Sequence, residues 1–114
     1  MAVRAKGTIA LTRGVPVTLF EETIPANLPG IYGGEVDLTQ LLNIADEINI
    51  RRQTKYDTGS PFRNAQTNTY KRGEDIYQLT PVEASFGHKL TIELLSVSPS
   101  ATANLEFVIT RNNA

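Results

Sequence analysis

The chain has 114 residues, with 11 basic and 12 acidic side chains and a formal net charge of −1. A chain of this length forms one domain around one core, and its balanced charge argues against a protein that depends on nucleic acid or anionic lipid. It has no cysteine, which excludes disulfides and thiolate metal sites. No stretch approaches the ~20 apolar residues of a membrane span, and no signal sequence is evident. We therefore expect a protein made in the cytoplasm, with no membrane partner.

Residues 1–14 carry three basic side chains and modest apolar content, so they are either an N-terminal arm that orders on binding or a first strand over 7–11. Residues 15–24 alternate apolar and polar side chains and predict a strand. Pro16 has no N–H to donate, which places this strand at a sheet edge or makes the proline its start. The stretch 27–35 is rich in proline and glycine and predicts a loop.

A short helical stripe follows in residues 38–45, with Asp37 in position to cap it. Its apolar members are spaced i, i+3, i+4 and i+7: Leu38, Leu41, Leu42 and Ala45. The run is too short for a full helix, so we expect at most one helical turn there. A turn that ends in Asp46 and Glu47 then leads into the next strand.

The strand that begins at Ile48 has one apolar face, which becomes polar at Arg52. Residues 57–74 then contain almost no aliphatic side chain and predict a long polar excursion between two strands. Further strands are expected over 75–86, 88–99 and 104–112. Turn signals at this spacing predict an all-β fold, a single-domain β-sandwich or barrel of about seven or eight antiparallel strands over 15–114. The expected core comprises Ile48, Ile50, Leu90, Ile92, Leu105, Phe107 and Ile109.

The sequence offers no recognisable reaction chemistry. His88 is the only histidine, and one histidine without cysteine or a second histidine does not complete a common zinc site. The adjacent carboxylates at 21–22, 46–47 and 74–75 would point to opposite faces of a strand, so they do not automatically form the pair that a glycosidase needs. No phosphate-binding loop or nucleophile elbow is present. We expect no enzyme, no catalytic residue, no cofactor and no metal.

Basic and aromatic residues gather between positions 51 and 72. The basic ones are Arg51, Arg52, Lys55, Arg63, Lys71 and Arg72, and the interleaved aromatic ones are Tyr56, Phe62 and Tyr70. Such a patch is typical of a single-strand nucleic-acid binder, but the net charge makes nucleic acid a less favoured partner. A protein-contact surface is favoured, because arginine and aromatic residues are enriched in binding hot spots.

A sugar- or receptor-binding sandwich is a further alternative that stays open. The aromatic candidates for such a site are Tyr32, Tyr56, Phe62, Tyr70 and Tyr77. Tryptophan, the commonest sugar platform, is absent.

Residues 36–111 also resemble a known group of proteins. The order VDLTQLL, INIRRQTKYD, DIYQLTP and GHKLTIELLSVSPSATANLEFVITR is similar to that of small proteins encoded among the structural genes of tailed bacteriophages, several of which are head decoration (cement) proteins. The chain departs from that pattern at Ala45-Asp46, where a Gly-Asp turn is more usual.

The resemblance implies a non-enzymatic virion protein on the outer capsid surface. It would be a homodimer or homotrimer, assembled in the host cytoplasm, that stabilises the head by contacting the major capsid protein or other virion subunits. The contact residues expected on this basis are Arg4, Lys6, Arg63, Asn64 and Tyr70.

Overall fold

A computed structural model describes residues 2–24, 28–72 and 77–113. Within these ranges the chain forms eight strands and one 3-10 turn, η1, arranged in two four-stranded antiparallel sheets. The elements are β1 (Ala2–Thr12), β2 (Val17–Thr23), β3 (Gly30–Val36), η1 (Leu38–Gln40), β4 (Glu47–Thr54), β5 (Arg63–Lys71), β6 (Tyr77–Ala84), β7 (Gly87–Leu94) and β8 (Thr102–Asn113). The prediction of an all-β sandwich is confirmed.

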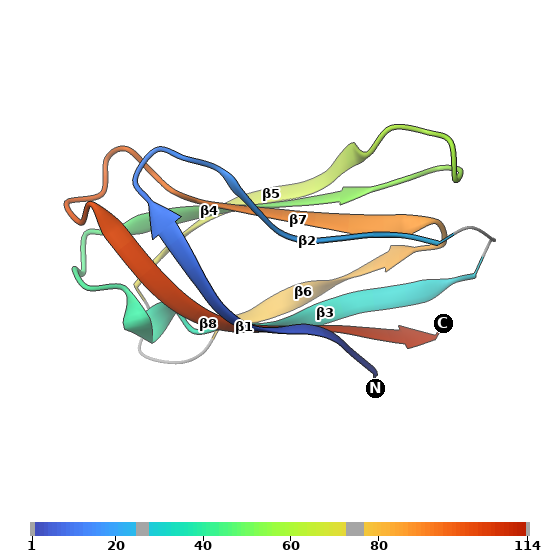
Figure 1. Cartoon of the computed structure of the whole chain (residues 1–114), viewed down its shortest axis with the longest axis horizontal. Coiled ribbons are helices and arrows are strands. Elements are labelled where there is room, and N and C mark those ends of the chain that lie inside the picture. The colour runs from blue at the N-terminus through green and yellow to red at the C-terminus, as the bar shows by residue number, and fades with distance from the viewer. Residues whose placement is uncertain (1, 25–27, 73–76, 114) are drawn as a thin grey trace.

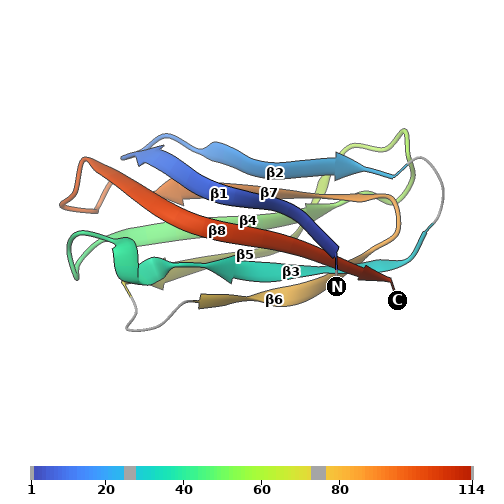
Figure 2. The same cartoon turned by 60° about the horizontal axis from the view of Figure 1, so that its bottom comes forward.

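The two sheets have the strand orders β1-β8-β3-β6 and β2-β7-β4-β5, and every neighbouring pair is antiparallel. The chain crosses repeatedly between the layers, and Figure 1 shows them packed face to face. This interleaved order is that of a jelly roll, a double-sheet β fold built from two Greek keys. Seen from another side, β1 and β2 run together along one long side of the sandwich (Figure 2), where they are in contact.

The core lies between the sheets, where alternate side chains of each strand point inward. Six of the seven predicted core residues are at most 2% exposed, and Phe107 is half-buried against the same cluster. The helical turn is also present at Leu38–Gln40, and the Asp37 side chain accepts a hydrogen bond of 3.0 Å from the Thr39 N–H. Only Leu38 and Leu41 of the predicted stripe are buried.

The prediction of a loop over 27–35 is wrong for residues 30–35, because Gly30–Val36 forms β3, which lies between β8 and β6; residues 28–29 precede the strand, and residue 27 lies outside the described residues. The register of β3 against β6 shifts between Tyr32 and Gly34, which marks a bulge. Gly34 has φ +138°, and a Cβ there would lie 2.0 Å from the Val108 carbonyl oxygen. Glycine in this stretch therefore permits close approach of two strands and does not signal a loop.

The predicted polar excursion over 57–74 is wrong in part, because Arg63–Lys71 forms β5. This strand pairs with β4 from Glu47 opposite Lys71 to Thr54 opposite Arg63. Its polar composition follows from its place at the edge of a sheet, where exposed residues alternate with half-buried ones. Exposed and half-buried side chains do alternate along β5, but the alternating residues are mostly Thr, Asn and Gln and not aliphatic ones.

Of the two alternatives for residues 1–14, the structure has the strand. β1 pairs with β8 from Ala2 to Thr12, with one register shift between Val3 and Ala5. The edge position expected for the strand after Pro16 is also present, since β2 is an outer strand of its sheet.

Candidate functional site

The five predicted contact residues lie on two strands that belong to different sheets. Arg4 and Lys6 are on β1, and Arg63, Asn64 and Tyr70 are on β5. Because β1 and β5 are edge strands at opposite sides of the strand orders, the structure does not bring the two groups together into one surface.

On β1, the two basic residues differ in their surroundings. Arg4 Nε lies 3.4 Å from Glu22 Oε2, which links β1 to β2 across the long side of the sandwich. Lys6 is exposed and pairs in register with Val108 of β8. Lys6 is therefore available to a partner, whereas Arg4 also serves to join the two sheets.

On β5, the contact candidates differ in the same way. Arg63 and Asn64 are exposed, and the Arg63 guanidinium lies 5.3 Å from the centroid of the Tyr56 ring. Tyr70 is half-buried opposite Ile48 and packs against the hydrophobic core. Tyr70 thus has a structural contact besides any role at the surface.

The basic patch expected between positions 51 and 72 is not a single surface, which corrects that expectation. Arg52 points into the sandwich and is 2% exposed. Arg63 and Lys71 are the first and last residues of β5, so they lie ~26 Å apart at the rise of a β-strand. The Lys71 ammonium is 3.7 Å from the Glu47 carboxylate. The surface that suggested a nucleic-acid binder therefore loses Arg52, whereas Lys55 still contacts the Phe62 ring and Arg63 the Tyr56 ring.

The interior at one end of the sandwich holds a group of polar side chains, which we call the polar cluster: Glu22, Tyr32, Arg52, His88 and Arg111. The Tyr32 hydroxyl donates to Glu22 Oε1 at 2.7 Å, and Arg52 Nε donates to His88 Nε2 at 2.9 Å. The Tyr32 ring stacks on the His88 ring at 4.8 Å, and the Arg111 guanidinium lies 5.5 Å from the Tyr32 centroid. Tyr32 is fully buried, so it cannot serve as a sugar platform.

The electrostatics of the polar cluster keep its two rings neutral at pH 7. Burial, reinforced by the hydrogen bond to Glu22, raises the pKa of Tyr32 to about 12. Burial and the nearby Arg52 guanidinium lower the pKa of His88 to about 3. A neutral His88 accepts the Arg52 N–H, so this pair satisfies two buried polar groups inside the sandwich.

The polar cluster stabilises the interior and does not line a surface hollow. A surface hollow of about 330 Å³ is lined by Thr54, Lys55, Tyr56, Glu83, Ala84, Ser85 and Phe86, and no member of the polar cluster lines it. Across residues 2–24, 28–72 and 77–113, no group of three or more His, Cys, Asp or Glu side chains is arranged to hold a metal ion. In the same ranges, no helix is both long and apolar enough to cross a bilayer.

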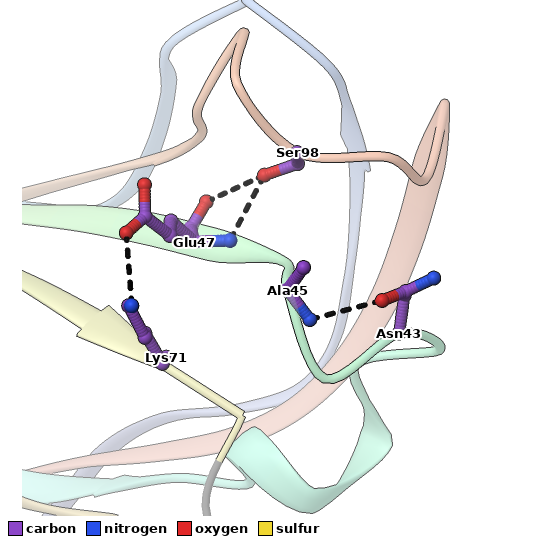
Figure 3. A network of polar contacts seen from close by, with 5 residues as sticks. All are labelled: Asn43, Ala45, Glu47, Lys71 and Ser98. Atoms are coloured by element: carbon purple, nitrogen blue, oxygen red, sulfur yellow. Dashed lines mark hydrogen bonds and ion pairs between the residues drawn. The ribbon is translucent and has the colours of Figure 1, made fainter.

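At the opposite end, loops 41–46 and 95–101 are joined by polar contacts. Ser98 Oγ accepts from the Glu47 N–H at 2.9 Å and donates to the Glu47 carbonyl at 3.0 Å, and Lys71 approaches the Glu47 carboxylate from β5 (Figure 3). Nearby, the buried Asp46 carboxylate accepts from the Ser100 hydroxyl at 2.6 Å and from the Asn43 N–H at 3.0 Å. Burial alone would raise the pKa of Asp46, but these hydrogen bonds outweigh it and the pKa lies below its usual value.

The outer face of the β1-β8-β3-β6 sheet holds a shallow hollow of about 360 Å³. Its lining includes Val3, Ile31, Pro81 and Val108 around Gly33, which contributes no side chain. Because Lys6 neighbours Val108 on the same sheet, this face combines an apolar depression with an exposed cation. That combination suits contact with another protein.

Sequence reasoning missed Glu22 and Arg111 as members of the polar cluster. The available signal was the alternation in β8, where Leu105, Phe107 and Ile109 point inward and the next residue in phase is Arg111. The same continuation in β4, from Ile50 to Arg52, places an arginine in the interior.

No protein-family model matches the sequence, and a search of curated protein sequences found no match. Solved structures do share the fold. The crystal structure of PirA aligns with a TM-score of 0.59 and 9% identity over 92% of this chain and 93% of that chain. A structure of infectious bursal disease virus, Gt strain, aligns with a TM-score of 0.53 and 12% identity over 98% of this chain. The match spans 32% of the viral chain, so this chain corresponds to about a third of it.

A third structure comes from Bacillus endospore appendages, described as disulfide-linked pili. It aligns with a TM-score of 0.50 and 14% identity over 98% of this chain and 88% of that chain. At such identities these similarities establish a shared fold: the jelly roll of this chain resembles folds found in a virus and in a pilus.

Proposed function

We propose that the chain is a non-enzymatic structural protein of a virus particle, of the kind that tailed bacteriophages place on the outside of the head to stabilise it. The observation that carries the proposal is the jelly-roll strand order over the whole sandwich, an architecture common in viral capsids. The alignment of 98% of the chain with a virus structure supports the same class. The resemblance of residues 36–111 to phage decoration proteins supports the finer assignment.

The surface offers what a decoration subunit needs. Lys6 on β1, and Arg63 and Asn64 on β5, are exposed on a rigid two-sheet scaffold. Rigid elements hold contact residues in place before binding, so little ordering entropy is lost. The proposed partners are the major capsid protein or other virion subunits on the outer capsid surface, after synthesis in the host cytoplasm. A homodimer or homotrimer would multiply weak contacts into stable attachment.

The pilus similarity leads to a different expectation. The matched appendages are described as disulfide-linked, and this chain has no cysteine with which to form such a link. Disulfides therefore cannot join copies of this chain, and the proposed attachment of a decoration subunit needs none.

Co-sedimentation of the purified protein with undecorated particles of the virus that encodes it tests the proposal. We expect the protein to enter the particle fraction in a fixed ratio to coat subunits and to raise the temperature at which the particles open. Arg63→Glu should weaken this binding, whereas Arg63→Lys, which keeps the charge, should weaken it less. The proposal is wrong if the protein stays in the supernatant and if mass spectrometry finds none of it in purified virions.

A further inference from the structure

The sandwich has four edge strands, β1, β6, β2 and β5, and three of them carry the usual protection against pairing with another chain. Proline, charged residues and bulges blunt a sheet edge. β1 has the basic side chain of Lys6 and a register shift between Val3 and Ala5. β6 contains Pro81, and its pairing with β3 is interrupted by a bulge.

β2 is protected as well. Its register against β7 shifts between Thr18 and Phe20, and the adjacent acids Glu21 and Glu22 follow in the same strand. An incoming strand at this edge would meet both a local twist and negative charge.

β5 lacks these features over most of its length. Its register shift lies near its start, opposite Arg52 and Gln53, and from Gln66 to Lys71 it pairs with β4 without interruption. Residues 64–70 contain no proline and no charged side chain, and β5 pairs with β4 but with no other strand in the described part of the chain. The result is a regular edge, uncharged between its first and last residues, whose outward main-chain groups suit strand addition.

We propose that β5 is a docking edge that receives an extended segment of another protein, with acidic residues near both of its ends, as a fifth strand of the β2-β7-β4-β5 sheet. Within the proposed function this segment belongs to a virion subunit, so the partner's identity rests on that function, whereas the edge itself does not.

Charge selects this partner over a second copy of the chain. β5 begins with Arg63 and ends with Lys71, and it has no acidic residue. In the fullest antiparallel register, centred on Thr67, two copies would place Arg63 of each opposite Lys71 of the other. In a parallel register, each cation would lie beside its own counterpart. Like charges directly opposite destabilise a strand pair, whereas acids at these two positions stabilise it.

The side chains along β5 specify the middle of the incoming segment. Thr67 and Thr69 are exposed on the outer face, and Gln66 and Asn68 are half-buried on the inner face. Threonine and β-branched neighbours pair well across strands with such residues. The segment is therefore expected to be uncharged and rich in Thr and Val between its acidic ends.

A nine-residue capped peptide, DTVTVTVTD, matches the length of β5 and places an acid at each end. Titrating it into isotopically labelled protein, followed by amide chemical shifts, should move signals from β4 and β5, and added salt should weaken binding. A control peptide with lysine in place of both aspartates should bind at least roughly fivefold more weakly than the acidic peptide. Thr67→Glu should reduce binding of the acidic peptide, whereas Thr8→Glu on the edge strand β1 should not.

Shifts confined to other strands, or equal binding of the two peptides, would overturn the proposal. A concentration-dependent dimer whose interface maps to β5 without peptide would also overturn it, in favour of a second copy. Failure of the β5 docking proposal can be distinguished from failure of the proposed virion role. If Thr67→Glu and wild-type protein bind particles equally, the virion role stands and the β5 edge is not the docking site.

Discussion

The two ends of the sandwich interior are filled with different chemistry. Near loops 13–16 and 95–101, where the Gly14 N–H donates to the Leu94 carbonyl, the side chains between the sheets are aliphatic, with Leu11, Leu94 and Leu105 each at most 1% exposed, while the buried Asp46 and Ser98 lie in the loops that close this end. At the opposite end, the polar cluster fills the interior with Arg52, His88 and its other members. The aliphatic end gains stability from removal of apolar area from water, which needs no fixed geometry. The polar end depends on hydrogen bonds between buried groups, such as that from Arg52 to His88.

The largest single effect is expected at the aliphatic end. Leu105→Ala removes a fully buried side chain and should lower the free energy of unfolding by about 2–5 kcal/mol, because a cavity remains in the core. Chemical denaturation followed by circular dichroism measures the change. Leu42→Ala, at a residue 74% exposed, is the matched control and should change stability by less than about 0.5 kcal/mol.

The polar end should respond to acid. The unfolded chain protonates its histidine near pH 6.5, but folded His88 does so only near about pH 3, so the unfolded state binds more protons between these values. The free energy of unfolding should therefore fall as pH falls through this window, by up to about 1.4 kcal/mol per pH unit. Asp46, which lies at the other end of the sandwich and has a lowered pKa, adds a further loss only below the usual aspartate pKa.

His88→Gln tests this assignment, because a glutamine oxygen can accept the Arg52 N–H without titrating. Denaturation midpoints measured from pH 7 to pH 4.5 should depend less on pH in this variant. An unchanged pH dependence would show that other groups cause the loss of stability in acid.

A substitution at Arg52 should separate packing from hydrogen bonding at the polar end. Arg52→Met keeps an unbranched apolar side chain but removes the donors to His88 and to the Tyr32 carbonyl. We expect a loss of about 1–3 kcal/mol, the cost of leaving buried acceptors unsatisfied. A stabilised Arg52→Met variant would mean that the polar end is no more dependent on its partners than the aliphatic end.

The smallest effect is expected for an ion pair on the surface. Glu21→Gln removes the 3.6 Å contact between the Glu21 carboxylate and the Lys89 ammonium. The Glu21 side chain is 51% exposed and the Lys89 side chain 30% exposed. The loss should lie within about 0–1 kcal/mol and decrease with added salt. A larger loss than that of Arg52→Met would contradict the view that burial decides the value of polar contacts here.

The sequence predicted most of the aliphatic core, because a period of two in Leu, Ile and Val identifies inward positions directly. β3 and β5 escaped prediction for different reasons. In β3, glycines at 30, 33 and 34 serve a buried strand with a bulge, although their local pattern is that of a loop. In β5, alternation occurs among polar residues, where hydropathy carries no signal.

The candidate site was harder to predict than the fold. The contact residues Arg63 and Lys6 were chosen from the polar stretch 57–74 and from the basic N-terminal segment, but their placement on separate sheets depends on strand order. The polar cluster joins residues from five strands, and a pairing such as Arg52 with His88 spans 36 positions. Alternation in the sequence shows on which face of its strand a residue lies. Which residues of other strands it contacts depends on the order of the strands in the sheets.

The two adjacent glycines of β3 differ in how well they should tolerate substitution during evolution. At position 34 a Cβ would lie 2.0 Å from the Val108 carbonyl oxygen, and the backbone has φ +138°, so any other residue must break the strand register. At position 33 a Cβ would lie 3.7 Å from Thr110 Oγ1, an ordinary contact, so alanine is admissible. Relatives that keep this jelly roll are thus free to fill the outer hollow through residue 33. Residue 34 should remain glycine in all of them.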